Sequence, residues 1–347
     1  MNHVMSVVER LAFAEAEFKK FRIELPHLTA AEVRLDAMRA SIQHTRGQEQ
    51  NPLFLIGPSH SGKSTIIKHW CERIAASEPQ QGSSPSILHV TLSTSSTVKS
   101  LGADILVALG HLAPPMEVIE DTARRRGRVR RRSIDPSASD FWLLILAMRS
   151  VGLAGVDVLV LDELHHLVQS DKAVVTRYSV TEAIKKICIE GVCQVVGVGT
   201  ERLGAILCAD NSKQLANRAQ TPIVLRPLDI AISKNAKLFK QWVGAVDEKL
   251  VEHGIFPEKC GLARQEWLSS FYDVSRGIIG RVSRLVAEAT NHAIINGRHK
   301  LAADDLSYAT RNWAMFYKLA DWDPWKEKQG PRDLKVIKGF ADKEFPL

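Results

Sequence analysis

One stretch of the sequence combines residue types and spacing that suit phosphate binding. Residues 57–64 read Gly-Pro-Ser-His-Ser-Gly-Lys-Ser, which fits the pattern G-x-x-x-x-G-K-[ST]. Glycines let the backbone wrap around a phosphate, and N–H groups at the start of a following helix add positive potential. Lys63 would then reach the β- and γ-phosphates of ATP. The expected ATP-binding residues are Gly57, Pro58, Ser59, His60, Ser61, Gly62, Lys63, Ser64 and Thr65.

A second stretch supplies the acidic groups that such a site needs. The apolar run Val158-Leu-Val-Leu ends in Asp162 and Glu163, about a hundred residues after the glycine-rich loop. Asp162 and the Ser64 hydroxyl are the expected Mg²⁺ ligands, and Asp162 also counts among the cofactor-binding residues. Glu163 is placed to polarise a water molecule. The Asp-Glu pair therefore favours ATP hydrolysis over simple nucleotide holding.

Two further positions extend the expected catalytic set. The strand Cys193–Gly199 ends in Thr200, where ATPases with an added central strand place a sensor of the γ-phosphate. Arg218 closes the string Gln-Leu-Ala-Asn-Arg just before another strand. That is the usual place for an arginine that completes the site of a neighbouring subunit. The predicted catalytic residues are thus Glu163, Thr200 and Arg218.

The elements that position these residues alternate between strand and helix. Apolar runs predict strands at 52–56, 87–92, 156–161, 193–198 and 222–225, with helices at 62–76, 98–109, 139–151, 174–190 and 201–208. This alternation predicts an α/β fold with a parallel five-stranded sheet between helices. From residue 231 only helices are expected, at 233–252, 264–275, 279–296 and 303–319.

The same pattern predicts how the chain is divided. We expect a helical N-terminal segment over 1–50, a P-loop ATPase core over 51–228, an all-helical lid over 229–320 and a tail over 321–347. The tail holds Trp322, Trp325, Phe340 and Phe345 among charged residues. It fits a partner-docking peptide and an unstructured end equally well.

The order of these motifs resembles an AAA+ ATPase. More narrowly, five strings resemble the TniB/TnsC family of ATP-dependent regulators of DNA transposons: Ile56-Gly-Pro-Ser-His-Ser-Gly-Lys-Ser64, Val160-Leu-Asp-Glu-Leu-His165, Val196-Gly-Val-Gly-Thr200, Gln214-Leu-Ala-Asn-Arg218 and Gly277-Ile-Ile-Gly280. The resemblance covers roughly residues 5–315. It implies a protein that assembles with ATP as a ring or filament on duplex DNA, links a target-selector protein to the transposase, and disassembles on hydrolysis.

The resemblance also implies residue roles. Thr200 would be the first sensor and Arg218 a finger acting on a neighbouring subunit. The common AAA+ lid pattern is G-x-x-R, and here the sequence departs from it, because Gly280 stands third after Gly277. The second sensor of the nucleotide would then be Arg281 or, as the alternative, Arg284. The sequence is equally compatible with an ordinary surface arginine at either position.

The charge distribution indicates a polyanionic partner. The net charge is +7, and one run holds seven arginines: Arg124, Arg125, Arg126, Arg128, Arg130, Arg131 and Arg132. Without them the chain carries 39 basic and 39 acidic residues. With no aromatic residue interleaved, the run suits sequence-independent contact with DNA phosphates, although such a run is as often simply solvated.

Composition narrows the class of protein and its expected location in the cell. The chain is 45% hydrophobic and 24% charged, which is typical of a globular protein, and its longest apolar run has eight residues, too short for a membrane span. Five cysteines without a C-x-x-C pair, and the lack of a secretory pattern, predict a cytoplasmic protein. The resemblance to the TniB/TnsC family implies a prokaryotic, nucleoid-associated one. A helicase loader, a replication-initiator-like ATPase or a signalling NTPase remains the alternative function.

Overall fold

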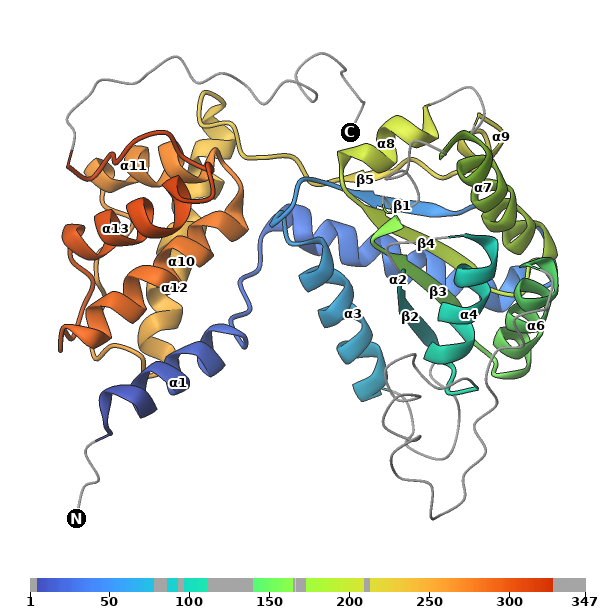
Figure 1. Ribbon diagram of the computed structural model, residues 1–347, viewed down its shortest axis with the longest axis horizontal. Helices are drawn as coiled ribbons and strands as arrows, with labels where there is room; N and C mark the ends of the chain where they lie inside the picture. Colours follow the sequence, from blue (N-terminus) through green and yellow to red (C-terminus); the bar gives the residue numbers. More distant parts are fainter. Residues whose placement is uncertain are drawn as a thin grey trace. The chain divides into compact units, whose positions relative to one another are not determined.

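The computed structural model describes residues 5–77, 86–92, 97–111, 140–164, 166, 173–208 and 213–326. The chain divides into two compact units (Figure 1). The sheet unit comprises Ala30–Gly57 and Lys63–Leu225. The helical unit comprises Met1–Thr29, Pro58–Gly62 and Arg226–Leu347. The glycine-rich loop is therefore grouped with the helical unit, although both of its flanking elements belong to the sheet unit.

The sheet unit is built on five parallel strands in the order β2-β3-β4-β1-β5. Their bounds are β1 Leu53–Ile56, β2 Ile87–Thr91, β3 Val158–Asp162, β4 Gln194–Gly199 and β5 Ile223–Val224. Strands β1, β3 and β4 are buried along their whole length. Near-continuous apolar runs are typical of parallel strands that helices cover on both faces. The predicted α/β fold with five parallel strands is confirmed.

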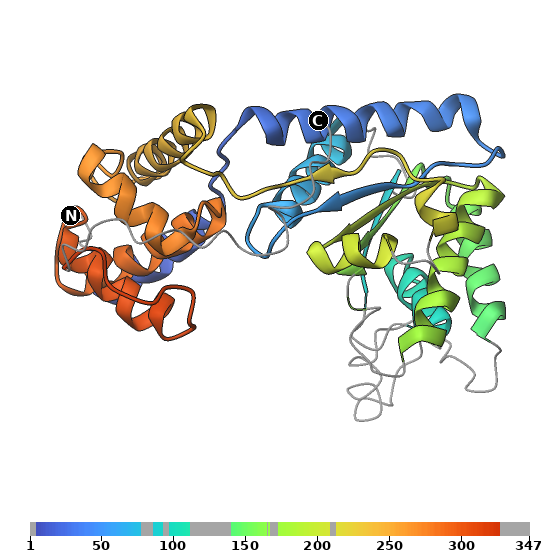
Figure 2. The ribbon, with the colours of Figure 1, turned by 90° about the horizontal axis from the view of Figure 1, so that it is seen from above.

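Two groups of helices cover the two faces of this sheet (Figure 2). The helices are α2 Pro26–Thr45, α3 Lys63–Ser77, α4 Val98–Ala108, α6 Asp140–Leu153, α7 Ala173–Glu190, α8 Glu201–Leu207 and α9 Lys213–Ala216. Helices α4, α6 and α7 share one core with the side chains of Phe54, Leu159 and Val195. Because neighbouring strand residues point to opposite faces, Leu53, Val158 and Val196 face the side of α2 and α3. Helices α2 and α3 are joined by the hydrogen bond that Trp70 donates to Asp36 over 2.9 Å.

The helical unit has its own hydrophobic core. Its elements are α1 Val7–Phe18, α10 Ser233–Glu252, α11 Gln265–Ser275, α12 Ile279–Ile295, α13 Ala303–Ala309 and the π-helix η3 Thr310–Met315. Helix α1 packs against α12 (Figure 1), and His253 at the end of α10 lies 2.8 Å from Glu17 of α1. The first two helices of the chain thus fall mainly in different units, α1 in the helical unit and most of α2 in the sheet unit.

One predicted helix takes a different form. The stretch expected as a single helix over 303–319 is α-helical only to Ala309 and continues as the π-helix η3. The Thr310 hydroxyl donates to the Leu306 carbonyl over 2.8 Å, and a side chain that binds a helical carbonyl loosens the regular ladder. Among the described residues, no helix is both long enough and apolar enough to cross a bilayer.

Candidate nucleotide site

The loop between β1 and α3 has the backbone shape of a phosphate cradle. His60 and Gly62 adopt positive φ angles of 66° and 97°, and the Ser61 N–H donates to the Pro58 carbonyl over 3.1 Å. Alternation of right- and left-handed backbone turns successive N–H groups toward one concave side, which is how such loops bind anions. Ser64 and Thr65, in the first turn of α3, are exposed and accessible to a ligand.

Lys63 is the buried cation of this loop. Its side chain donates from Nζ to the Gly57 carbonyl over 2.9 Å, and the residue is 9% exposed. Burial lowers the pKa of the ammonium group, while the charges of Glu201, Glu163 and Asp162 act in the opposite direction. A buried lysine facing several carboxylates is positioned to neutralise a polyphosphate.

Asp162 is the last residue of β3, and Glu163 follows it at the carboxyl edge of the sheet. The Glu163 N–H donates to Asp162 Oδ1 over 2.8 Å, and Glu163 itself has a positive φ of 58°. A positive φ is uncommon outside glycine, and it directs the Glu163 side chain away from the regular strand path.

His89 of β2 contacts Asp162 and was not anticipated from the sequence. Its Nε2 lies 3.4 Å from Asp162 Oδ2. Burial would raise the pKa of Asp162, but hydrogen bonds from His89 and the Glu163 N–H hold that pKa below its ordinary value. The sequence signal that could have found it is the alternation of apolar Leu88 and Val90 with polar His89 and Thr91, which gives β2 one polar face.

Thr200 directly follows β4 at the same edge of the sheet. The Gly57 N–H donates to the Gly199 carbonyl over 3.2 Å, so β1 and β4 end together. The Thr200 Oγ1 atom is buried and has no hydrogen-bond partner among the described residues; the same holds for Ser61 Oγ. A buried hydroxyl is normally satisfied, so the Thr200 Oγ1 atom fits a position that a phosphate or its water would complete.

Arg218 lies at the opposite, amino edge of the sheet. Its Nε atom donates to Glu49 over 2.5 Å, and the nearby Gln220 N–H donates to the Pro52 carbonyl at the start of β1. The five-residue path from Pro52 to Gly57 spans about 16 Å of extended strand. The structure thus brings Lys63, Asp162, Glu163 and Thr200 to one edge and separates Arg218 from them.

The two candidate lid arginines differ in their surroundings. Arg284 is exposed and forms an ion pair with Glu288 one turn along α12, at 2.5 Å. Arg281 is half-buried.

The arginine run at Arg124, Arg125, Arg126, Arg128, Arg130, Arg131 and Arg132 lies outside the described residues, as do Phe340 and Phe345 of the tail. Trp325 of the expected tail packs edge-on against Trp267 and Phe271 of α11.

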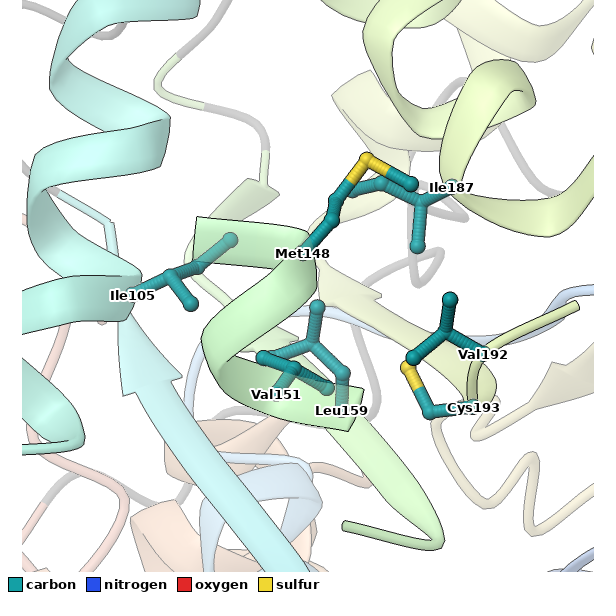
Figure 3. A pocket seen from close by; sticks show the side chains of 7 residues that line it. All are labelled: Ile105, Met148, Val151, Leu159, Ile187, Val192 and Cys193. Carbon is teal, nitrogen blue, oxygen red and sulfur yellow. The ribbon is translucent and has the colours of Figure 1, made fainter. Parts of the chain in front are cut away.

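A small cavity elsewhere in the sheet unit is apolar (Figure 3). Its lining side chains are Ile105, Met148, Val151, Leu159, Ile187, Val192 and Cys193. Burial raises the pKa of the Cys193 thiol to about 12, so this thiol stays protonated and unreactive. A void without polar partners does not hold water or a charged ligand. The cavity is a packing feature of the core.

Known proteins share this architecture. Residues 44–207 match the family model described as an AAA domain. Cdc6p from Pyrobaculum aerophilum superposes with a TM-score of 0.55 at 15% identity, over 86% of this chain and 70% of that one. For Aeropyrum pernix ORC1, solved in complex with DNA, the TM-score is 0.58 at 15% identity, over 89% of this chain and 71% of that one.

A. pernix ORC2, solved with ADPNP and ADP, gives a TM-score of 0.56 at 13% identity, over 85% of this chain and 70% of that one. No curated protein gives a significant match. At these identities the structural likeness shows the fold. The chain has an AAA+ fold with a helical C-terminal region, and the AAA domain match supports nucleotide hydrolysis in general.

Proposed function

We propose that this protein is a DNA-bound ATPase that assembles with ATP and acts as a regulator of DNA transposition. The observation that carries the proposal is the separation of two half-sites on one sheet. The carboxyl edge of the sheet holds Lys63, Asp162, Glu163 and Thr200. Arg218 lies at the amino edge, and a strand of about 16 Å separates the two edges. An arginine that is too far from the phosphate of its own subunit could act on the phosphate of a second copy.

Each residue at the carboxyl edge has a distinct task in this proposal. Residues 57–65 would hold the phosphates of ATP, with Lys63 against the β- and γ-groups. Ser64 and Asp162 would hold Mg²⁺, which neutralises phosphate charge when bound. Glu163 would accept the proton of the attacking water, and Thr200 would donate its free hydroxyl toward the γ-phosphate.

The transposition role rests on the sequence strings that resemble the TniB/TnsC family. It makes duplex DNA, further copies of this chain, a transposase and a target selector the partners, with the protein located at the nucleoid. The functional division would follow an ATPase core over 51–228, a lid over 229–320 and a docking tail over 321–347. Trp322 and Trp325 of this tail are buried or packed in the helical unit, so docking would fall to the residues after them.

A replication-initiator-like ATPase or helicase loader is the second candidate. It is favoured by the fold likeness to Cdc6p and to ORC1, the latter solved with DNA. A transposase gene beside the gene for this protein would favour the first candidate. Specific co-assembly with a replicative helicase and no effect on transposase activity would favour the second.

Lys63→Ala is expected to lower the affinity for ATP about 10- to 100-fold, because the variant cannot form a charge-assisted hydrogen bond to phosphate. Nucleotide-dependent assembly should fail with it. Titration with a fluorescent ATP analogue and light scattering with duplex DNA would measure both effects. Lys68→Ala, on the exposed side of the same helix, is the matched control. Equal affinities for the two variants would contradict the assigned role.

Replacing Arg128, Arg130, Arg131 and Arg132 with Gln is expected to weaken binding to all duplexes alike. The plot of log affinity against log salt concentration should also become less steep. Its slope should fall in magnitude by roughly 0.9 for each phosphate that is no longer neutralised. ATP affinity should not change. Lys19, Lys20 and Lys259, exposed in the helical unit, provide a control set for the same change to Gln. A salt slope equal to wild type would show that another surface holds DNA.

A further inference from the structure

The first two turns of α10 carry three exposed lysines on one side of the helix. Lys234, Lys237 and Lys240 recur at intervals of three residues. Residues three apart are neighbours on a helix surface, so the three side chains form one group. The opposite side of α10 packs into the helical unit, with Phe239 and Val246 buried in its core. The three lysines therefore make a basic surface directed to solvent, here called the α10 lysine face.

The positive charges of this face have no neutralising partner among the described residues. Within that part of the chain, none of the three lysines forms an ion pair or a side-chain hydrogen bond. Other lysines of the same unit lie 2.5 to 3.1 Å from a carboxylate oxygen: Lys19, Lys20, Lys249, Lys259 and Lys300. Asp229, just ahead of α10, accepts from the Ala231 N–H over 2.9 Å. The α10 lysine face thus gathers three uncompensated charges.

The local rules of helix stability oppose lysines at these positions. The N–H groups at the start of a helix carry partial positive charge, which disfavours cations there. The N-cap residue Ile232 makes no side-chain hydrogen bond, and the first turn of α10 holds no acidic residue. Lysines on neighbouring positions of one helix face also repel one another. An arrangement that lowers helix stability without a local gain is typical of a functional surface.

The chemistry of the face suits a phosphate backbone. Ser233 and Gln241, exposed beside the lysines, are polar. A protein interface is built around a buried apolar core, and Ile232, 54% exposed at the edge of the face, is too small to form one. Contact with DNA phosphates needs only positive charge. From Lys234 to Lys240 the helix rises about 9 Å, which matches the axial length of about three phosphates of one DNA strand.

We propose that the α10 lysine face binds the phosphate backbone of duplex DNA, as a contact additional to the arginine run at 124–132. Each ammonium group would pair with a phosphate oxygen and release the counterions condensed there. Phosphates carry no sequence information, so the contact does not depend on the DNA sequence. The inference rests on the proposed function for duplex DNA as the partner, and it adds where on the helical unit that partner is held.

Changing Lys234, Lys237 and Lys240 together to Gln in the full chain tests the proposal. Fluorescence anisotropy would follow binding to random-sequence duplexes at several salt concentrations. Affinity at low salt should fall about tenfold, and the plot of log affinity against log salt concentration should lose about 2 to 3 in slope, or roughly 0.9 for each phosphate. A slope equal to wild type would overturn the proposal, and it is the result expected if the face binds an acidic protein instead.

Lys19, Lys20 and Lys259 are the matched control set for the same change to Gln. They belong to the same unit, their side chains are 61 to 73% exposed, and each is paired with a carboxylate. The net charge changes equally in the two variants, so a general effect of charge would appear in both. A slope that falls as much in the control as in the lysine-face variant would also contradict the proposed contact.

Lysine reactivity of the wild type gives a second measurement that needs no variant. Saturating duplex should slow acetylation of Lys234, Lys237 and Lys240 about fivefold, because an ammonium group bound to phosphate is shielded from the reagent. Acetylation of Lys259 should not change. Mass spectrometry of the digested chain would measure each site. Equal acetylation of the three lysines with and without DNA would rule out the contact.

The outcomes also separate this inference from the proposed function. If the wild type binds duplexes and the lysine-face variant keeps the wild-type slope, only the inference fails. If the wild type binds no duplex in the presence of ATP, the proposed function fails as well. The melting temperature of the lysine-face variant should equal or exceed that of the wild type, because like charges leave the start of a helix. Weaker DNA binding together with a lower melting temperature would assign the lysines a structural role and refute the proposal.

Discussion

Replacing Arg218 with alanine is expected to lower ATP turnover about 10³- to 10⁵-fold, the effect of removing an arginine that stabilises charge on a transferring phosphate. ATP affinity should stay near that of the wild type, because Arg218 and Lys63 lie at opposite edges of the sheet. Folding stability should change little, since the substitution removes a partly exposed ion pair with Glu49 and an exposed hydrogen bond to the Gln214 carbonyl. Steady-state phosphate release and analogue titration would measure the first two quantities.

A mixing experiment distinguishes action on a neighbouring subunit from action within one chain. Arg218→Ala keeps its ATP site and Glu163, and Glu163→Gln keeps its arginine and is expected to assemble. A mixture of these two inactive variants should therefore recover part of the turnover. Arg73→Ala is the matched control, because Arg73 is also exposed and also paired with a carboxylate, Asp36, at 2.8 Å. Wild-type turnover in Arg218→Ala, or no recovery on mixing, would refute the proposed role.

Glu163→Gln is expected to reduce turnover about 10²- to 10⁴-fold, because glutamine cannot accept a proton from water. The substitution retains the size of the side chain and leaves the hydrogen bond from the residue 163 N–H to Asp162 in place. ATP should therefore still bind, and the ATP-bound assembly on DNA should persist far longer than that of the wild type. Light scattering would follow the disassembly of this complex after it is diluted into buffer without ATP.

This variant and Lys63→Ala should fail in opposite directions, the first locked in the assembled state and the second unable to reach it. Glu72→Gln, an exposed change on α3, is the control for loss of a carboxylate. Disassembly of Glu163→Gln at the wild-type rate would exclude Glu163 as the base.

Much of the fold could be predicted because its signals are local. Apolar runs of four to six residues form the buried strands β1, β3 and β4, and the pattern over 57–64 encodes its own turn through Gly62. Asp162 and Glu163 could be placed after β3 for the same reason, because a residue's position along a strand is set by its immediate neighbours. The roles of these residues, and of Thr200, stay predictions.

Only the tertiary structure decided which distant residues meet. His89 reaches Asp162 because β2 pairs with β3, a choice of neighbour that no property of residues 87–91 encodes. The amino-edge position of Arg218 follows from the pairing of β5 with β1. A hydrogen bond from the Gly280 N–H to the His60 carbonyl joins backbones 220 positions apart in the chain, and backbone groups carry no sequence signal except the absence of a side chain. Sequence alone therefore determined the elements, whereas long-range packing determined which elements meet. Packing depends on the shapes of whole surfaces and not on local composition.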